Sequence, residues 1–97
     1  MPHMNIVKFH VKPELENDFF DAFQNESLHV GQVSGQLVQI AENKFCSIGL
    51  WESQSAMDEA MDDRISFLDT IRHMLITISE DLGVTDPASG PVLIEHN

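Results

Sequence analysis

The sequence has few positive charges, one cysteine and no long apolar segment, and each shortage excludes a class of protein. Five lysine and arginine residues stand against 16 aspartate and glutamate residues, so the formal net charge is −11. This charge would repel a phosphate backbone, and nucleic-acid binding is not expected. Cys46 is alone, which excludes an intrachain disulfide and a multi-thiolate zinc site. No apolar run approaches the roughly 20 residues of a membrane-spanning helix.

The rest of the composition is that of a folded chain. Apolar residues make up 42% of the 97 residues, which argues against disorder. A chain of this length can build one core but not two, so we expect a single domain over residues 1–97. The first residues, MPHMNIVKF, have neither the basic start nor the apolar stretch of a secretory signal. A cytoplasmic location is therefore the default expectation.

Apolar periodicity in the first half of the chain predicts a strand, a helix and a hairpin. Residues 4–11 have strand character, and Pro13 suits the first turn of a helix that continues to about residue 26. Residues 33–41 and 44–51 are predicted to be strands joined by a short polar turn. The apolar residues on one face of the helix are Leu15, Phe19, Ala22 and Phe23.

The second half of the chain predicts helical segments and a last strand. Ser55, with Asp58 three residues later, forms a weak capping box that would open a helical region. A long helix is expected over residues 65–82, with Gly83 as its stop. Residues 84–90 are expected to form a loop, and residues 91–96 a short final strand.

This order of elements, β-α-β-β-α-β, is that of the split ferredoxin-like α+β fold. In this fold a four-stranded antiparallel sheet carries both helices on one face. The other face, lined by Cys46, Ile48 and Leu50 or by their alternates, would leave a large apolar patch in contact with water. Packing of this face against a second copy would cover it, so a homodimer through the sheet is predicted.

Three segments resemble the antibiotic-biosynthesis-monooxygenase-like family of dimeric α/β-barrel proteins. They are Lys12-Pro13-Glu14 after the first strand, Leu50-Trp51-Glu52-Ser53 followed by Ala56, and the long helix behind them. The resemblance implies a pocket between sheet and helices in each subunit. It also implies cofactor-independent oxygenation of a polycyclic aromatic or quinol substrate, in which the carbanion of the substrate itself reduces oxygen. Such a protein supplies an apolar cavity, a base or hydrogen bond, and exclusion of water.

The resemblance nominates four residues for this chemistry. Trp51 would stand at the cavity wall, Asn5 would be a hydrogen-bond partner, and Arg72 would stabilise the developing oxyanion. His29 would act as the base if its connection folds over the pocket mouth. Each also has a structural interpretation, in which Trp51 is a core or interface aromatic and Asn5 satisfies backbone groups. In the same interpretation Arg72 pairs with a surface aspartate and His29 is solvated.

No cofactor and no metal ion are expected. The other four histidines lack ligand spacing, and the acidic run over residues 58–63 fits a solvated helix face better than a calcium loop. The haem-degrading branch of the same superfamily combines a first-strand Asn with a helical Trp and a His on the long helix. Asn5 could match the first of these, but Ala60 stands where the Trp is needed and His73 points away from the apolar stripe. Haem degradation is therefore not expected.

Two other functions use the same pocket. In one, the protein is a non-enzymatic ligand-binding or structural dimer, since a fold does not determine a function. In the other, it is an isomerase or decarboxylase that differs from the oxygenase in its proton path. A cavity touched by Trp51 and Arg72 would favour an enzyme. A cavity filled by Phe19, Phe23, Phe67 and methionine side chains would favour the non-enzymatic protein.

Overall fold

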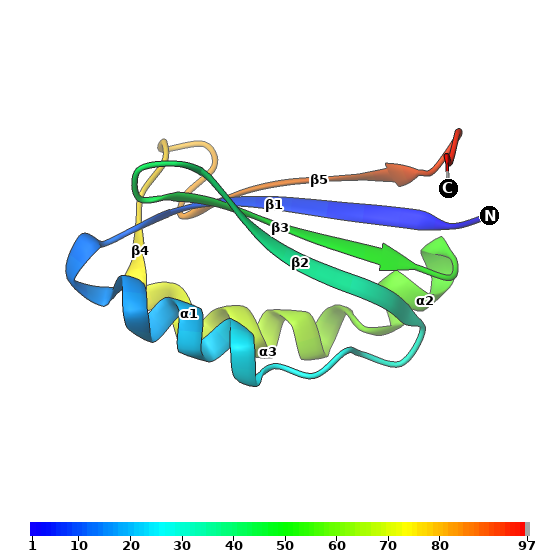
Figure 1. The fold of residues 1–97 in the computed structure, drawn as a ribbon, viewed down its shortest axis with the longest axis horizontal. Helices are drawn as coiled ribbons and strands as arrows, with labels where there is room; N and C mark the ends of the chain where they lie inside the picture. The colour runs from blue at the N-terminus through cyan, green and yellow to red at the C-terminus, as the bar shows by residue number, and fades with distance from the viewer. Residues whose placement is uncertain (97) are drawn as a thin grey trace.

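The computed structural model describes residues 1–96, and its frame is an antiparallel sheet with helices along one face (Figure 1). The strands are β1 (His3–Val11), β2 (Gln32–Ala41), β3 (Lys44–Trp51), β4 (Leu75–Ile76) and β5 (Thr85–Pro91). Their order is β2-β3-β1-β4, and β5 also pairs with β1. Strand β1 is thus the centre of the sheet, with β3 along one side. Along its other side, β5 pairs with residues 3–9 of β1 and the two-residue β4 pairs with residues 10–11.

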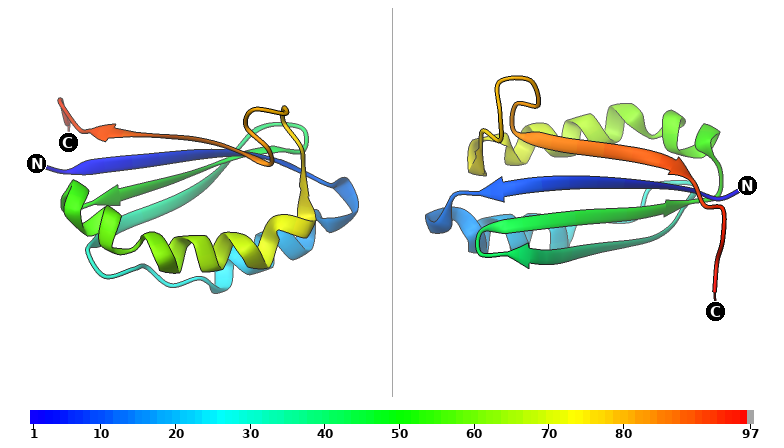
Figure 2. Two further views of the ribbon diagram at one scale, coloured as in Figure 1. Left: turned by 180° about the vertical axis from the view of Figure 1, so that it is seen from behind. Right: turned by 90° about the horizontal axis from the view of Figure 1, so that it is seen from above.

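The helical elements all lie on the same side of this sheet, as Figures 1 and 2 show. They are η1 (Pro13–Leu15), α1 (Glu16–Asn25), α2 (Gln54–Glu59), α3 (Met61–Ile71) and η2 (Arg72–Met74). Helix α1 faces the sheet with Phe19, which is completely buried, because its apolar residues recur at helical spacing. The α+β class and the one-sided placement of the helices are as the sequence predicts.

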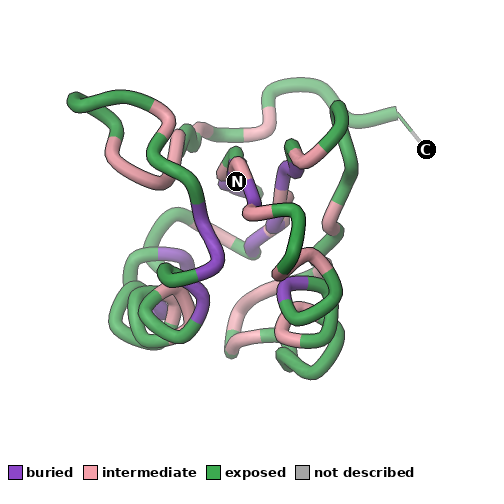
Figure 3. The backbone as a smooth tube through the Cα atoms, turned by 90° about the vertical axis from the view of Figure 1, so that its left-hand side faces the viewer, coloured by how far each residue is buried: buried purple, intermediate pink, exposed green. Residues whose placement is uncertain are grey.

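Two apolar clusters hold the helices to the sheet. The larger consists of Phe9, Val11, Phe19, Phe45, Ile71, Met74 and Leu75. Its rings meet edge to face or tilted, for example Phe9 and Phe19 with centroids 5.6 Å apart. The smaller cluster, Trp51, Met57 and Ala60, ties α2 to the end of β3. Figure 3 shows the buried stretches gathered in the middle strands and on the sides of the helices that face them.

The predicted hairpin of β2 and β3 is confirmed. The two strands pair antiparallel up to Ala41 and Lys44, and Asn43 in the turn has φ 61°, a conformation that asparagine tolerates better than most residues. The helical region after β3 starts earlier than predicted. Ser53, and not Ser55, is its N-cap, since its Oγ accepts a hydrogen bond of 3.1 Å from the backbone N–H of Ala56.

The prediction of one long helix over residues 65–82 is wrong. Helix α3 ends at Ile71, and after one 3₁₀ turn Leu75 and Ile76 form β4. The backbone N–H of Lys12 donates to the carbonyl of Met74 at 2.8 Å, and Leu75 is buried in the larger cluster. Pairing with β1 and burial therefore outweigh helical periodicity in this segment, where β-branched residues already favour an extended backbone.

The predicted loop and last strand are displaced. Residues 85–91 form β5, whereas residues 92–96 have no regular structure and project from the body in both views of Figure 2. The sheet therefore has five strands and not four. The sequence does not predict this strand because Pro87 and Pro91 lie within it, and proline is uncommon inside strands. They are tolerated because β5 is an edge strand, whose outer N–H groups need no partner in the sheet.

The face of the sheet opposite the helices carries an apolar strip. Strand register pairs Met4 with Leu50 and Ile6 with Ile48, and cross-strand partners share a face. Val38 lies on the neighbouring strand opposite Cys46 and is 40% exposed. Within residues 1–96, no helix or loop covers this strip (Figure 2, right).

Candidate functional site

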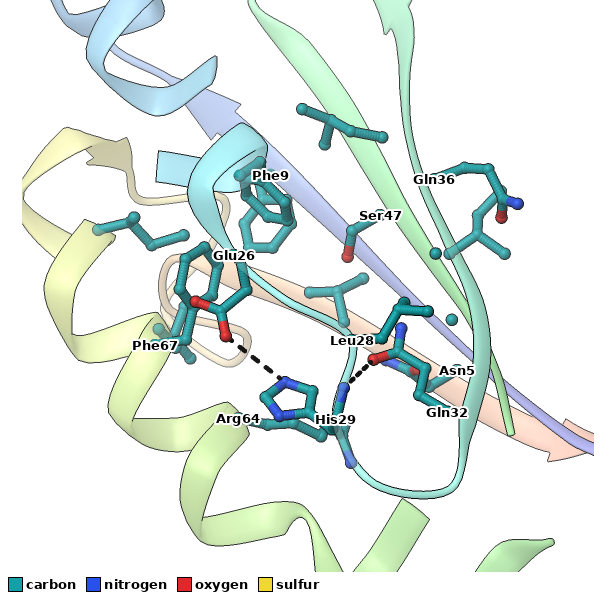
Figure 4. A pocket seen from close by; sticks show the side chains of 18 of the residues that line it. Asn5, Phe9, Glu26, Leu28, His29, Gln32, Gln36, Ser47, Arg64 and Phe67 are labelled. Carbon is teal, nitrogen blue, oxygen red and sulfur yellow. Dashed lines mark hydrogen bonds and ion pairs between the residues drawn. The ribbon is translucent and has the colours of Figure 1, made fainter. Parts of the chain in front are cut away.

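A cavity of about 620 Å³ lies between the sheet and the helices. This volume is within the range of small-molecule sites, about 300–1,000 Å³. Its walls are mostly apolar and it is partly open to solvent. Figure 4 shows side chains from β1, β2, β3, α3 and the segment after α1 converging on it.

Small residues in the sheet leave the space for this cavity. Gly35 and Gly49 are cross-strand partners on β2 and β3, and both line the cavity together with Ser47. Large side chains at these positions would fill the volume between sheet and helices. The aromatic residues form the wall at one end without filling the space, with the Phe23 and Phe67 rings packed edge to face at 5.0 Å.

Trp51 and Asn5 form a buried polar pair at the opposite end of the cavity. The indole Nε1–H of Trp51 donates to Oδ1 of Asn5 at 2.7 Å, and both residues are at least nine-tenths buried. Gly49 makes this contact possible, because a Cβ there would clash with Asn5 Oδ1 and lie 3.0 Å from Trp51 Nε1. Both residues line the cavity.

The Trp51 bond fixes which way the Asn5 amide points. An indole N–H can only donate, so the atom that accepts from it must be the amide oxygen. Among residues 1–96 no hydrogen bond from the Asn5 amide nitrogen to a protein group is found, and no enclosed side-chain nitrogen or oxygen there lacks a partner, so this nitrogen is not fully covered by protein atoms. The cavity therefore contains an oriented amide donor suited to a carbonyl oxygen or an oxyanion of a ligand.

His29 lies at the cavity mouth, in the segment between α1 and β2. Its imidazole stacks on Trp51 with ring centroids 6.0 Å apart and 12° between the planes. Its backbone N–H donates to Oε1 of Gln32 at 3.1 Å, and its Nε2 lies 3.9 Å from a Glu26 carboxylate oxygen (Figure 4). These contacts hold one ring face against the wall of the cavity.

Gly31 sets the path of this segment. Its φ is +83°, and a Cβ there would lie 2.6 Å from the Cβ of Ala56. Its carbonyl accepts a hydrogen bond of 2.9 Å from the backbone N–H of Glu52. The close approach to α2 and the left-handed conformation both require glycine, and together they turn the chain so that His29 faces the cavity.

Arg64 on α3 is a cavity residue that the sequence analysis missed. Its guanidinium carbon lies 5.6 Å from the Trp51 ring centroid, in the range of a cation–π contact. Burial lowers the pKa of Arg64, and the charge of nearby Asp58 offsets part of this shift. The signal was present in the sequence, since Arg64 precedes Leu68 and Ile71 at spacings of four and seven, and all three line the cavity.

Arg72 lies elsewhere. It is in η2, outside the set of residues that line the cavity, and its Nε donates to Oδ1 of Asp69 at 2.8 Å on the exposed surface. The oxyanion role expected for Arg72 goes with the predicted helix over residues 65–82, but α3 ends at Ile71, one residue before Arg72. The structure thus brings Asn5, Trp51 and His29 together and leaves Arg72 apart from them.

Neither a metal centre nor a membrane-spanning helix is found in the described part of the chain. Residues 1–96 contain no group of three or more His, Cys, Asp or Glu side chains arranged to hold an ion. None of their helices has the length and apolar character required to cross a bilayer.

No protein-family model and no curated protein matches the sequence. Solved structures do match. A candidate antibiotic biosynthesis monooxygenase from Chloroflexus aurantiacus J-10-fl has a TM-score of 0.76 at 11% identity, over 100% of this chain and 98% of the other. Rv0793 from Mycobacterium tuberculosis has a TM-score of 0.75 at 15% identity, over 100% of both chains. SnoaB, a cofactor-independent oxygenase from Streptomyces nogalater, has a TM-score of 0.65 at 14% identity, over 97% of this chain and 95% of SnoaB.

These matches confirm the likeness to antibiotic-biosynthesis-monooxygenase-like proteins at the level of the fold. They extend over nearly the whole chain, so the likeness includes both the sheet and the helices. At 11–15% identity they carry no residue roles.

Proposed function

We propose that the protein is a cofactor-independent monooxygenase that binds a planar aromatic ketone or quinol in the cavity between sheet and helices. One observation carries this proposal: the amide of Asn5, a residue that lines an apolar cavity, is locked through its oxygen by Trp51, which leaves its N–H groups available to a ligand. A donor that is held in place before the substrate binds stabilises negative charge as it develops on a substrate oxygen. The likeness in fold to SnoaB is consistent with this chemistry.

The reaction needs little from the protein beyond this arrangement. For an anthrone-type methylene, a base removes one proton, and the resulting enolate passes an electron pair to oxygen as a carbon–oxygen bond forms. The peroxide takes up the proton, and elimination of water, which removes the second methylene hydrogen, leaves a ketone. One oxygen atom of O₂ is then in the product and the other in water.

Three residues of the cavity have roles in this scheme. The Asn5 amide donates to the enolate oxygen, which is the role that the sequence analysis gave to Arg72. His29 is the base, since its imidazole is at the mouth and Glu26 is placed to stabilise the protonated ring. Trp51 holds Asn5 in place and forms part of the cavity lining.

The sheet face opposite the helices supports a homodimer. Met4, Ile6, Ile48 and Leu50 form cross-strand pairs on this face, and Val38 extends the strip onto β2. An uncovered strip of this kind is unusual in a soluble monomer. A second copy packed on it would bury the strip in a two-fold interface, and sedimentation equilibrium would then give twice the monomer mass of 10.9 kDa.

Oxygen uptake with anthrone tests the catalytic proposal. Wild-type protein should consume one O₂ for each anthrone converted to anthraquinone, at a rate well above the uncatalysed oxidation. Asn5→Ala should lower kcat by roughly 100- to 1,000-fold, the effect of removing one oxyanion donor. Arg72→Gln is the matched control and should leave the rate unchanged, since Arg72 lies outside the cavity. A wild-type rate equal to the uncatalysed one would refute the proposal.

A second function, ligand binding without turnover, is favoured by one feature. The cavity is partly open to solvent, whereas carbanion chemistry benefits from exclusion of water. Binding of anthraquinone by calorimetry, together with no catalysed oxygen uptake, would support this function over the first.

A further inference from the structure

Arg64 is a cation at the cavity without an acidic partner. It is the only lysine or arginine among the cavity-lining residues of the described chain. The contacts of 4 Å or less between basic and acidic side chains found in residues 1–96 join His29 to Glu26 and Arg72 to Asp69, and neither involves Arg64. Within the described residues its guanidinium makes one hydrogen bond, from Nη1 to the carbonyl of Met57 at 3.4 Å. Most of the five donors of this guanidinium are therefore free for a ligand.

This charge is partly removed from water and incompletely compensated. Arg64 is half-buried, and burial lowers its pKa, although an arginine remains charged at neutral pH. Asp58 acts on it through space from beyond ion-pair distance. An anionic group that enters the cavity and pairs with the guanidinium would supply the missing counter-charge in a medium of low dielectric, where the interaction is stronger than in water.

The surroundings of Arg64 define the shape of such a ligand. The guanidinium lies over Trp51, and Figure 4 shows it beside His29 at the mouth. The aromatic wall with Phe23 and Phe67 is another part of the lining. A ligand that pairs with Arg64 would therefore reach the apolar wall with a planar ring. Glu26, the one acidic residue of the lining within residues 1–96, lies 3.9 Å from Nε2 of His29 and forms no ion pair with Arg64.

We propose that Arg64 makes the cavity selective for planar aromatic ligands that carry an anionic oxygen group, such as a carboxylate, over neutral ligands of the same shape. This inference rests on the proposed function of the cavity as a ligand site. The selectivity is not expected from the chain as a whole, because its net charge of −11 would disfavour any anion. A preference for the anion must therefore come from a local cation.

Isothermal titration calorimetry with 2-naphthoate and 2-naphthamide tests the inference, because the two compounds share a shape and differ in charge at pH 7. Wild-type protein should bind 2-naphthoate about tenfold or more tightly than the amide, as for a charge-assisted hydrogen bond. Arg64→Gln should remove this preference and leave binding of the amide within about twofold. Arg64→Met, whose unbranched side chain can still pack on Trp51, should behave like Arg64→Gln and guards against a folding defect.

Arg72→Gln is the matched control, since Arg72 is exposed and paired with Asp69, and it should keep the full preference. Trp51 is the only tryptophan, so a shift of its single indole N–H resonance on titration reports occupancy of this cavity. Equal binding of both compounds to wild type, or a preference that survives in Arg64→Gln, would overturn the inference and leave the proposed function standing. If neither compound binds and anthrone oxidation is also not accelerated, both fail together.

Discussion

Gly49→Ala is the substitution that most directly perturbs the buried pair on which the site depends. The added Cβ would clash with Asn5 Oδ1 and lie 3.0 Å from Trp51 Nε1 and 3.4 Å from Gln32 Nε2. Asn5 would have to move, because β1 and β3 are paired on both sides of this point. The 2.7 Å bond from Trp51 would then break inside a buried region.

The cost follows from the groups left without partners. A buried donor or acceptor without a hydrogen bond destabilises a protein by about 1–3 kcal/mol. For a chain of this size each kcal/mol lowers Tm by roughly 4–8 °C, so Gly49→Ala should lower Tm by roughly 5–20 °C. The Trp51 indole N–H resonance should also move, since its acceptor is displaced. Catalysis or binding in the cavity should be lost at temperatures where the variant is still folded.

Gly90→Ala provides the matched control. Gly90 also lies in a strand, but a Cβ there would meet no atom within 4 Å, so its Tm should stay near the wild-type value. Urea unfolding and the indole resonance, measured on both variants at one protein concentration, give the comparison. If Gly49→Ala had wild-type stability and an unshifted indole resonance, the argument that Trp51 fixes the Asn5 amide would be refuted.

Three further substitutions test other parts of the structure. Gly31→Ala should cost at least about 1–3 kcal/mol, because a side chain is strained at φ +83° and its Cβ would lie 2.6 Å from Ala56 Cβ; wild-type stability in urea would contradict this. Phe19→Ala should cost about 3–5 kcal/mol, since Phe19 is fully buried among aromatic rings, and a loss below 1 kcal/mol would place it outside the core. Arg72→Ala should change the unfolding free energy by no more than about 1 kcal/mol, as expected for an exposed ion pair, and a loss of ligand binding in this variant would return Arg72 to the site.

The first half of the fold could be predicted because its signals are local. The stripe that includes Phe19 and Phe23 specifies α1, and the polar turn at Asn43 specifies the hairpin. The second half could not, because residues 75–76 and 85–91 become strands only through pairing with β1, far away in the sequence. The helical spacing of apolar residues continues into the first of these segments, and the second contains two prolines. The local pattern therefore predicted a helix for the first and a loop for most of the second.

The site divides in the same manner. The proximity of Asn5 and Trp51 follows from the pairing of the first and third strands, which places His3 opposite Trp51, and the resemblance nominated both residues. Arg72 was nominated on the expectation of a helix over residues 65–82, whereas α3 ends at Ile71. Arg64 was overlooked, although its spacing to Leu68 and Ile71 places it on the same helix face. The error in the helix end therefore propagated directly into the choice of arginine.

A crystal structure of the protein with anthraquinone bound would test the ligand site most directly. We expect the ring system between the sheet and helices, against Phe23 and Phe67, with a carbonyl oxygen within about 3 Å of the Asn5 amide nitrogen. A ligand found on the outer face of the sheet, or in the cavity with its carbonyls turned away from Asn5, would contradict the account.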